Sequence, residues 1–377
     1  MATSNRLRLG IIGFGIHAIQ YYVPEIQSTD RAELAAISRR DPEALAQAKE
    51  ALGVSEAYTD WRELLDHAHV DAVIVTTSHA SHAAPTIAAL EMGLPVLVEK
   101  PMALTSQDAW TMVRAAERAD RPLMVAYQHW HCSGLWRTAK RLLREGAIGT
   151  LEQVGVTYSV YFRWLGELRS IPSAFAEQAF QVIREQMREL GVPAFVPDRS
   201  TDYWRTDRAQ MGGGMFVECG THFCDLALWL GGAPATTVVA LSEPKGKAAE
   251  RYLTATARLS NGVIASVMGN DGTDVRSQLT VIGDRGALTG EWTGFEGTPE
   301  LWLQREGKRE RVVSEYEDQT RVAAFVATVL DGAPNLSPGR DAAHVVEFTE
   351  AAYRSALEER FISVESPDSS APLSVEA

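Results

Sequence analysis

The stretch from Gly212 to Gly232 carries side chains suited to proton chemistry at helical spacing. They are Glu218, His222, Asp225 and Trp229. Because residues three and four positions apart share one face of a helix, we expect a polar seam on a largely apolar helix. A carboxylate four residues before an imidazole can accept a hydrogen bond from one ring nitrogen and leave the other free as an acid or base. Glu218 and His222 are therefore candidate catalytic residues, with a buried structural histidine as the alternative. Gly220 costs a helix about 1 kcal/mol relative to Ala, so another group is expected to approach closely there.

A glycine-rich motif follows the first predicted strand, Arg6 to Ile12, and opens a predicted helix that runs through Ile26. Its residues are Gly13, Phe14, Gly15, Ile16, His17 and Ala18, with the spacing G-x-G-x-x-A. In a Rossmann unit the first Gly allows a tight turn and the second lets the backbone approach a pyrophosphate. The phosphates then lie at the helix N-terminus. The motif predicts a dinucleotide site, and a simple tight turn is the alternative.

The second predicted strand, Glu33 to Ser38, ends where a nicotinamide enzyme selects its cofactor. The sequence there reads Ser38, Arg39 and Arg40, where an acidic residue would bind a ribose 2'-hydroxyl. A small polar residue followed by arginine suits a 2'-phosphate. We therefore expect NADP as the cofactor, with NAD still open because Asp41 follows closely.

Two further predicted strands end in polar residues. Ala72 to Thr76 leads into Thr77, Ser78, His79 and His82, and Val96 to Val98 leads into Glu99, Lys100 and Pro101. In an open α/β sheet, residues just past the carboxyl ends of strands line the ligand crevice. Both clusters are therefore expected at the site. The alternatives are a surface ion pair for Glu99 and Lys100, and helix capping or solvent exposure for His79 and His82.

These motifs, in this order, resemble the Gfo/Idh/MocA family of oxidoreductases over nearly the whole chain. The resemblance implies that Lys100 lies beside the nicotinamide and the substrate hydroxyl, and that the Lys100–Pro101 bond is cis. It also maps the family's Asp-x-x-x-His pair onto Glu218 and His222. Glu in place of Asp is a departure that moves the carboxylate by one methylene, which weakens the implied role of Glu218.

The resemblance extends to residues around the expected start of a second domain. It implies a cofactor contact by Gln128, where the family tends to have Asn or Gln, and it matches Trp204 and Arg205 to a family Trp-Arg pair. Trp130 and His131 are unusual for the family. We interpret them as candidate substrate contacts, because an aromatic face packs well on a sugar ring, with core packing as an equal alternative. Residues Ser173 to Leu190 have helical periodicity and are expected to wall the substrate pocket.

The order of elements predicts an α/β Rossmann domain over residues 1–126 and an α+β domain with a large, open, mostly antiparallel sheet over residues 127–364. Residues 365–377 are expected to form a disordered tail. Strands joined by short turns are predicted between residues 154 and 314. Two helices follow, Tyr316 to Leu330 and Gly339 to Glu358. Family members use one sheet face for subunit contacts, so the resemblance implies a homodimer or homotetramer.

Composition limits the classes of partner and compartment. The chain has 377 residues and a formal net charge of -13 without a long Lys/Arg block, which argues against nucleic acid or an anionic membrane as a partner. We find no membrane span or signal-peptide core and expect a cytoplasmic protein. The three cysteines, Cys132, Cys219 and Cys224, suit reduced thiols. No metal site is expected, because Cys224 would point away from Cys219 on a helix.

The sequence therefore predicts an NAD(P)-dependent oxidoreductase that transfers hydride between a nicotinamide and a carbon bearing a hydroxyl on a sugar, glycoside or cyclitol. His222 would remove the hydroxyl proton while Lys100 stabilises the oxyanion, and Lys100 as the base is the main rival. The resemblance leaves two other functions open. One is an NAD-dependent glycosidase with a transient redox cycle, and the other is a dinucleotide-sensing regulator without turnover.

Overall fold

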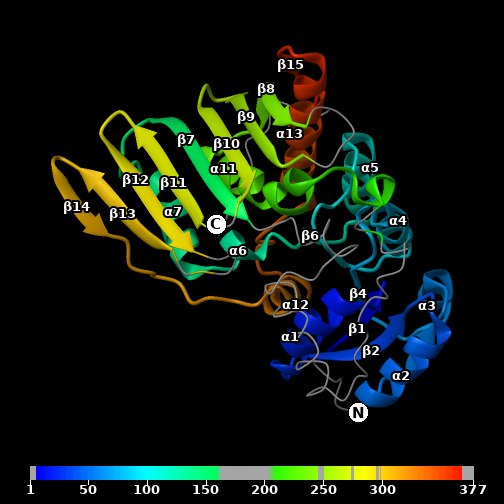
Figure 1. Cartoon of the computed structure of the whole chain (residues 1–377). Helices are drawn as coiled ribbons and strands as arrows, with labels where there is room; N and C mark the ends of the chain where they lie inside the picture. The colour runs from blue at the N-terminus through cyan, green and yellow to red at the C-terminus, as the bar shows by residue number, and fades with distance from the viewer. Residues whose placement is uncertain are drawn as a thin grey trace.

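The computed structural model describes residues 6–160, 204, 207–244, 250–272, 276–293, 297 and 299–366. Two β-sheets organise these residues (Figure 1). The six-stranded sheet lies at lower right in that view and the nine-stranded sheet at upper left. The Rossmann domain and the open C-terminal sheet predicted from the sequence are both confirmed.

The six-stranded sheet is wholly parallel and has the order β3-β2-β1-β4-β5-β6. Its strands are β1 (Leu7–Ile12), β2 (Ala32–Ser38), β3 (Glu56–Tyr58), β4 (Ala72–Val75), β5 (Val96–Val98) and β6 (Leu123–Val125). Its helical elements are η1 (Ala18–Tyr22), α1 (Val23–Gln27), α2 (Pro42–Leu52), α3 (Trp61–His67), η2 (His79–Ser81), α4 (Ala83–Glu91) and α5 (Ser106–Ala119). The strand order changes direction beside β1, and a ligand crevice is expected outside the strand ends at such a point.

The nine-stranded sheet is antiparallel except where β10 pairs with β7. Its strands are β7 (Leu151–Val160), β8 (Ala235–Glu243), β9 (Tyr252–Leu259), β10 (Ile264–Asp271), β11 (Arg276–Gly283), β12 (Gly286–Thr293), β13 (Glu300–Arg305), β14 (Lys308–Arg311) and β15 (Ile362–Ser363). The helical elements that follow β6 are α6 (Gln128–His131), α7 (Gly134–Arg144), α10 (Arg208–Met211), η4 (Phe216–Gly220), α11 (Thr221–Gly231), α12 (Arg321–Asp331) and α13 (Gly339–Glu358). Of these, α12 packs on α1 and α10 contacts η2.

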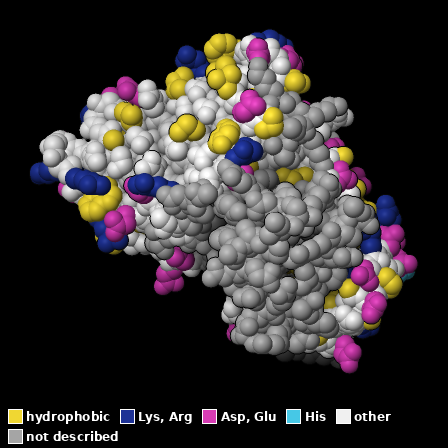
Figure 2. Space-filling model, viewed as in Figure 1, with side chains coloured by type: hydrophobic (Ala, Val, Ile, Leu, Met, Phe, Trp, Pro, Cys, Tyr) yellow, Lys and Arg dark blue, Asp and Glu magenta, His cyan; other side chains and the backbone are white. Residues whose placement is uncertain are grey.

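Helices cover one face of this sheet and leave the other open. α11 packs on β7 and β10, and α13 packs on β8. Buried and exposed residues alternate along β9 and β11, as expected for strands with one face in the core. Figure 2 shows hydrophobic side chains on the open face above β8 to β10. Leu241, Tyr252 and Met268 are exposed there.

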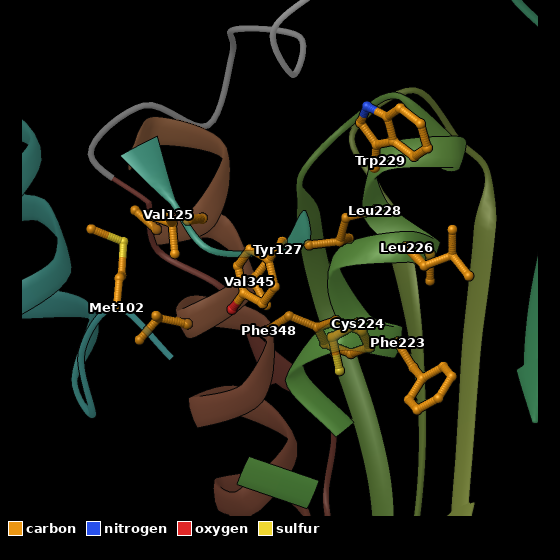
Figure 3. Packing of buried hydrophobic residues seen from close by; sticks show 14 of the residues in the cluster. Met102, Val125, Tyr127, Phe223, Cys224, Leu226, Leu228, Trp229, Val345 and Phe348 are labelled. Atoms are coloured by element: carbon orange, nitrogen blue, oxygen red, sulfur yellow. The ribbon is translucent and has the colours of Figure 1, made fainter. Parts of the chain in front are cut away.

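The core that joins the two sheets contains residues of both halves of the chain. Figure 3 shows Met102, Val125 and Tyr127 packed beside Val345 and Phe348 of α13, with α11 next to them. The site-bearing helix is therefore fixed against the Rossmann domain by a continuous apolar core.

Several predicted elements differ from the structure. The stretch predicted as one helix is a π-helical segment, η4, followed by α11. The strand predicted over Glu310 to Ser314 lies earlier in the chain, as the edge strand β14 over Lys308–Arg311. The helix predicted from Tyr316 begins at Arg321. Ser173 to Leu190 and the tail beyond residue 366 lie outside the described residues.

Candidate functional site

The glycine-rich loop between β1 and η1 has the geometry that the motif predicts. Gly13 has φ +85°, and a Cβ there would lie 2.7–2.8 Å from Thr77. The amides of Gly13 and Phe14 donate to the Ser38 carbonyl, which fixes the loop against the end of β2. A Cβ at Gly15 would meet only the Gly13 carbonyl oxygen, at 3.7 Å. The backbone at Gly15 is therefore open enough for a pyrophosphate to approach, ahead of the helical turns that begin beside His17.

The residues expected to select the cofactor lie beside that loop. The Ser38 side chain is buried, and Ser38 contacts the loop through its main-chain carbonyl. Arg39 Nη1 donates to the Phe14 carbonyl at 3.2 Å, and burial lowers the pKa of this guanidinium. Arg40 is exposed. Arg39 thus joins the end of β2 to the glycine-rich loop, where a ribose is bound in Rossmann domains.

The cluster after β4 is more buried than expected for a solvent-exposed segment. Thr77 and Ser78 are half-buried, whereas His79 and His82 are buried. The ring nitrogens of His82 lie 2.8 Å from the Pro101 carbonyl oxygen and 3.1 Å from that of Thr77. His79 Nδ1 lies 3.0 Å from the Met211 carbonyl oxygen, and burial lowers the His79 pKa to about 3. Solvent exposure of these histidines was the wrong alternative, and His82 is held by backbone groups.

Glu99 is a buried carboxylate shared by several partners. Its Oε1 accepts from the Tyr22 hydroxyl at 2.6 Å, and it lies 2.9 Å from His17 Nε2 and 3.4 Å from Arg321 Nη1. Burial opposes ionisation, but His17, Arg321 and Lys100 outweigh it and hold the Glu99 pKa well below its usual range. A surface ion pair is therefore the wrong alternative for Glu99. Sequence reasoning missed Tyr22 and Arg321, and no local pattern pairs Arg321 with a residue 222 positions away.

Lys100 links the end of β5 to the segment that carries Glu218. The Lys100–Pro101 peptide bond is cis, as the family resemblance implies. Lys100 Nζ donates to the main-chain carbonyl of Glu218 at 2.8 Å and lies 3.7 Å from its carboxylate. That carboxylate is also 3.5 Å from His79 Nε2. The hydrogen bond expected from Glu218 to His222 stays a prediction.

His222 occupies a buried position on the first turn of α11. Its side chain is only 2% exposed, and its ring centroid lies 5.7 Å from that of Tyr127 and 4.7 Å from that of His129. Burial, followed by the nearby His129 and Lys100, holds the His222 pKa well below its usual value. The imidazole is therefore neutral at pH 7, as a general base must be. His129 was not among the sequence-predicted site residues, although its neighbours Trp130 and His131 were.

Two of the three glycines before η4 lie against the side chains of Glu250 and Tyr353. Glu250 Oε2 accepts from the Gly214 amide at 2.9 Å and Oε1 accepts from the Phe216 amide at 2.7 Å. A Cβ on Gly214 would lie 2.6 Å from this carboxylate, and one on Gly213 would lie 2.5 Å from the Tyr353 hydroxyl. As expected, another group lies close to Gly220: a Cβ there would overlap the Tyr158 hydroxyl. The glycines let Glu250 and Tyr158 hold the segment that carries Glu218 and His222.

The structure favours core packing for Trp130 and His131. The Trp130 indole donates to the His222 carbonyl at 2.8 Å, and His131 Nε2 lies 2.9 Å from Asp225 Oδ2. Both side chains are at most 2% exposed. Asp225, part of the predicted polar seam, thus binds His131 and orients α11 against α6.

The remaining expected residues are placed only in part. The Trp204 ring packs edge-on against His79, with ring centroids 4.7 Å apart. Arg205 and the Gln128 side chain lie outside the described residues. Within the described part of the chain, no group of three or more His, Cys, Asp or Glu is arranged to hold a metal ion. In the same residues, no helix is both long and apolar enough to cross a membrane.

Comparison with known proteins identifies the family. A model described as an oxidoreductase family with an NAD-binding Rossmann fold matches residues 7–127, and the GFO/IDH/MocA C-terminal domain model matches residues 186–289. The chain belongs to the Gfo/Idh/MocA oxidoreductase family. The first match covers the six-stranded sheet, and the second covers α11 and strands β8 to β11 of the nine-stranded sheet.

The individual relatives share between about a fifth and a third of their aligned residues with this chain. The chain is 34% identical to D-apiose dehydrogenase of Paraburkholderia graminis, over 39% of this chain and 39% of that enzyme, so the match spans well under two thirds of the relative. It is 26% identical to inositol 2-dehydrogenase 2 of Saccharopolyspora erythraea, over 78% of each chain. A crystal structure of aldose-aldose oxidoreductase from Caulobacter crescentus has a TM-score of 0.75 at 22% identity, covering 95% of this chain and 99% of that one. At that identity the structure supports the fold alone.

Proposed function

We propose that this protein transfers hydride between a nicotinamide cofactor and a hydroxyl-bearing carbon of a sugar, glycoside or cyclitol. The observation that carries the proposal is the hydrogen bond from the Lys100 ammonium, just after β5, to the segment that leads into the helix with His222. This contact lies in the domain that also carries the glycine-rich loop, and Lys100 is one of the charges that lower the His222 pKa. Relatives named for D-apiose and inositol dehydrogenation support the substrate class.

The bound nicotinamide would accept the hydride, and the protein residues would handle the proton and the charge. Neutral His222 takes the proton of the substrate hydroxyl, and Lys100 stabilises the oxygen as negative charge develops on it. Glu218 lies beside Lys100 and His79, so its carboxylate would hold the ammonium in place. Lys100 acting as the base is the rival, and variants at the two positions separate the two roles.

We propose NADP as the preferred cofactor, with NAD also accepted. Support comes from Arg39, whose guanidinium is half-buried between the end of β2 and the glycine-rich loop, and from exposed Arg40 beside it. The openness of the backbone at Gly15 fits a pyrophosphate in either cofactor.

We also propose a homodimer or homotetramer and a cytoplasmic location. The open sheet face with Leu241, Tyr252 and Met268 exposed supports subunit contacts, and the unbridged cysteines suit a reducing compartment. Sedimentation of the purified protein measures the oligomeric state.

The experiment that tests the function is the absorbance of reduced nicotinamide after mixing protein with NAD or NADP and a panel of sugars, glycosides and cyclitols. A rise with one compound supports the dehydrogenase and chooses the cofactor. Tight cofactor binding without any net reduction across the panel would contradict it and favour a transient redox cycle or a regulator.

A further inference from the structure

A cavity of about 580 Å³ lies between the start of α7 and the chain that follows β14. Pockets that bind small ligands have volumes of roughly 300–1,000 Å³, so this one has the size of a ligand site. From α6 and α7 it is lined by His129, Trp130, Ser133, Leu135 and Trp136. The opposite wall is formed mainly by Arg311, Ser314, Tyr316 and Asp318.

His129 joins this cavity to the catalytic residues. Its ring lines the cavity and also packs against the His222 ring at a centroid distance of 4.7 Å. His129 therefore borders both the cavity and the His222 ring, which puts the cavity one side chain away from the proposed base.

The described walls suit an uncharged ring with one apolar face. Tyr316 is 38% exposed, and the Arg137 guanidinium lies over its ring at 4.6 Å, which leaves the ring fixed in position. Ser133, Ser314 and Asp318 place polar groups beside these aromatic walls. Asp318 Oδ1 accepts from the Gly134 amide at 2.6 Å, which anchors the wall. A carbohydrate or aryl ring has the matching combination of an apolar face and a polar rim.

The charges of the walls do not favour an anionic ligand. Arg311 is the basic residue among the described lining residues, and it is paired with Glu300 at 3.3 Å. Asp318 adds a negative charge. Burial, with Arg321 and Lys100 nearby, lowers the His129 pKa to about 3, so this imidazole is neutral at pH 7. A phosphorylated or uronate group would therefore meet no unpaired cation on these walls.

We propose that this cavity is a second subsite, which binds the ring linked to the sugar that is oxidised, so that the substrate is a neutral glycoside with a second ring. This inference rests on the proposed hydride transfer and adds the substrate class to it. The oxidised sugar lies at Lys100 and His222, and its glycosidic partner lies beyond His129 against Tyr316.

Steady-state kinetics on three substrates with the same oxidised sugar test the subsite. The substrates are a methyl glycoside, which has no second ring, the corresponding aryl glycoside and a disaccharide. We expect kcat/KM for at least one of the two ringed substrates to exceed that for the methyl glycoside by about tenfold or more, mainly through a lower KM. The comparison of aryl glycoside with disaccharide shows which kind of ring the subsite prefers.

Two aromatic variants localise the effect. Tyr316→Ala removes the aromatic wall, and Phe361→Ala removes an aromatic side chain that is 68% exposed beside β15, at the opposite edge of the nine-stranded sheet from β14. We expect Tyr316→Ala to reduce the preference for the ringed substrate to within a few-fold of unity. Phe361→Ala should retain the wild-type preference. If Tyr316→Ala does not fold, Asp318→Asn, which keeps an oxygen for the Gly134 amide, gives the second measurement and should also reduce the preference.

The outcomes separate the subsite from the underlying function. Oxidation of methyl and ringed glycosides with equal kcat/KM would overturn the subsite and leave hydride transfer intact. A preference that survives both Tyr316→Ala and Asp318→Asn would place the second ring elsewhere and overturn it as well. If no substrate reduces the cofactor, the proposed function itself fails.

Discussion

Lys100 Nζ donates a hydrogen bond of 2.8 Å to the main-chain carbonyl of Glu218, although 118 residues separate the two. One partner follows β5 of the Rossmann sheet, and the other belongs to η4, which leads into the helix that bears His222. The contact therefore places the ammonium of the cofactor domain next to the histidine of the second domain. Neither domain alone contains both groups.

Replacement of Lys100 tests the electrostatic half of the mechanism. Lys100→Met removes the cation that would stabilise the oxyanion, and we expect kcat to fall about 100- to 1,000-fold. Cofactor affinity, measured by quenching of protein fluorescence, should change far less. Lys100→Arg is the control that keeps the charge, and equal kcat values for the Met variant and wild type would remove Lys100 from the reaction.

Two histidines near α11 separate catalysis from stability. His222→Asn removes the proposed base, so we expect kcat to fall roughly 100-fold or more while cofactor still binds. His131→Asn breaks the buried pair with Asp225, and we expect the free energy of unfolding to fall by about 3–5 kcal/mol. Urea unfolding and initial rates on both variants measure the contrast. A larger loss of kcat in His131→Asn than in His222→Asn would reverse the assignment.

Some residues of the candidate site are indicated by local sequence signals, but their contacts are not. α2 begins at Pro42 and ends at Leu52 because of local signals: Asp41 caps its N-terminus and Gly53 adopts φ +64° after its C-terminus. Residues at strand ends were also expected at the site, since parallel strands end along one edge. At the end of the π-helical segment η4, Gly220 lies against Tyr158, which is a contact between distant parts of the chain. The link from Glu99 to Arg321 depends on tertiary packing in the same way.

The arginines after β2 test the cofactor. Replacing Arg39 and Arg40 together with Ala would remove the proposed hydrogen bonds to a 2'-phosphate, each worth about 1.5–3 kcal/mol, so KM for NADP should rise about tenfold or more. KM for NAD should change only a few-fold. Arg62→Ala, at an exposed arginine that pairs with Asp60 on the same domain, is the control. Equal increases for both cofactors would contradict the NADP assignment.

Glu250 tests whether the glycine segment positions the catalytic helix. Glu250→Ala leaves the amides of Gly214 and Phe216 and the Tyr353 hydroxyl without their shared acceptor. We expect the free energy of unfolding to fall by about 1–3 kcal/mol and kcat to fall while KM for the cofactor changes little. Glu250→Asp, which keeps the carboxylate, should recover part of both losses. A stability loss with unchanged kcat would limit Glu250 to a structural role.

Stability should fall as the pH drops below neutrality, because four histidines with lowered pKa values resist protonation in the folded protein. The pKa values of His79 and His129 are lowered to about 3, and those of His82 and His222 are lowered as well, with burial as the largest cause in each. Unfolded histidine has a pKa of about 6.5, so the unfolded chain binds more protons below that pH and is stabilised relative to the folded protein. Their contribution is therefore present above pH 6.5 and lost below it, by about 1 kcal/mol for each strongly shifted histidine between pH 7 and pH 5.5. Urea unfolding across this range measures the slope. His129→Gln should make the slope shallower, since one of the four groups is removed, and an unchanged slope would show that His129 titrates normally in the folded protein.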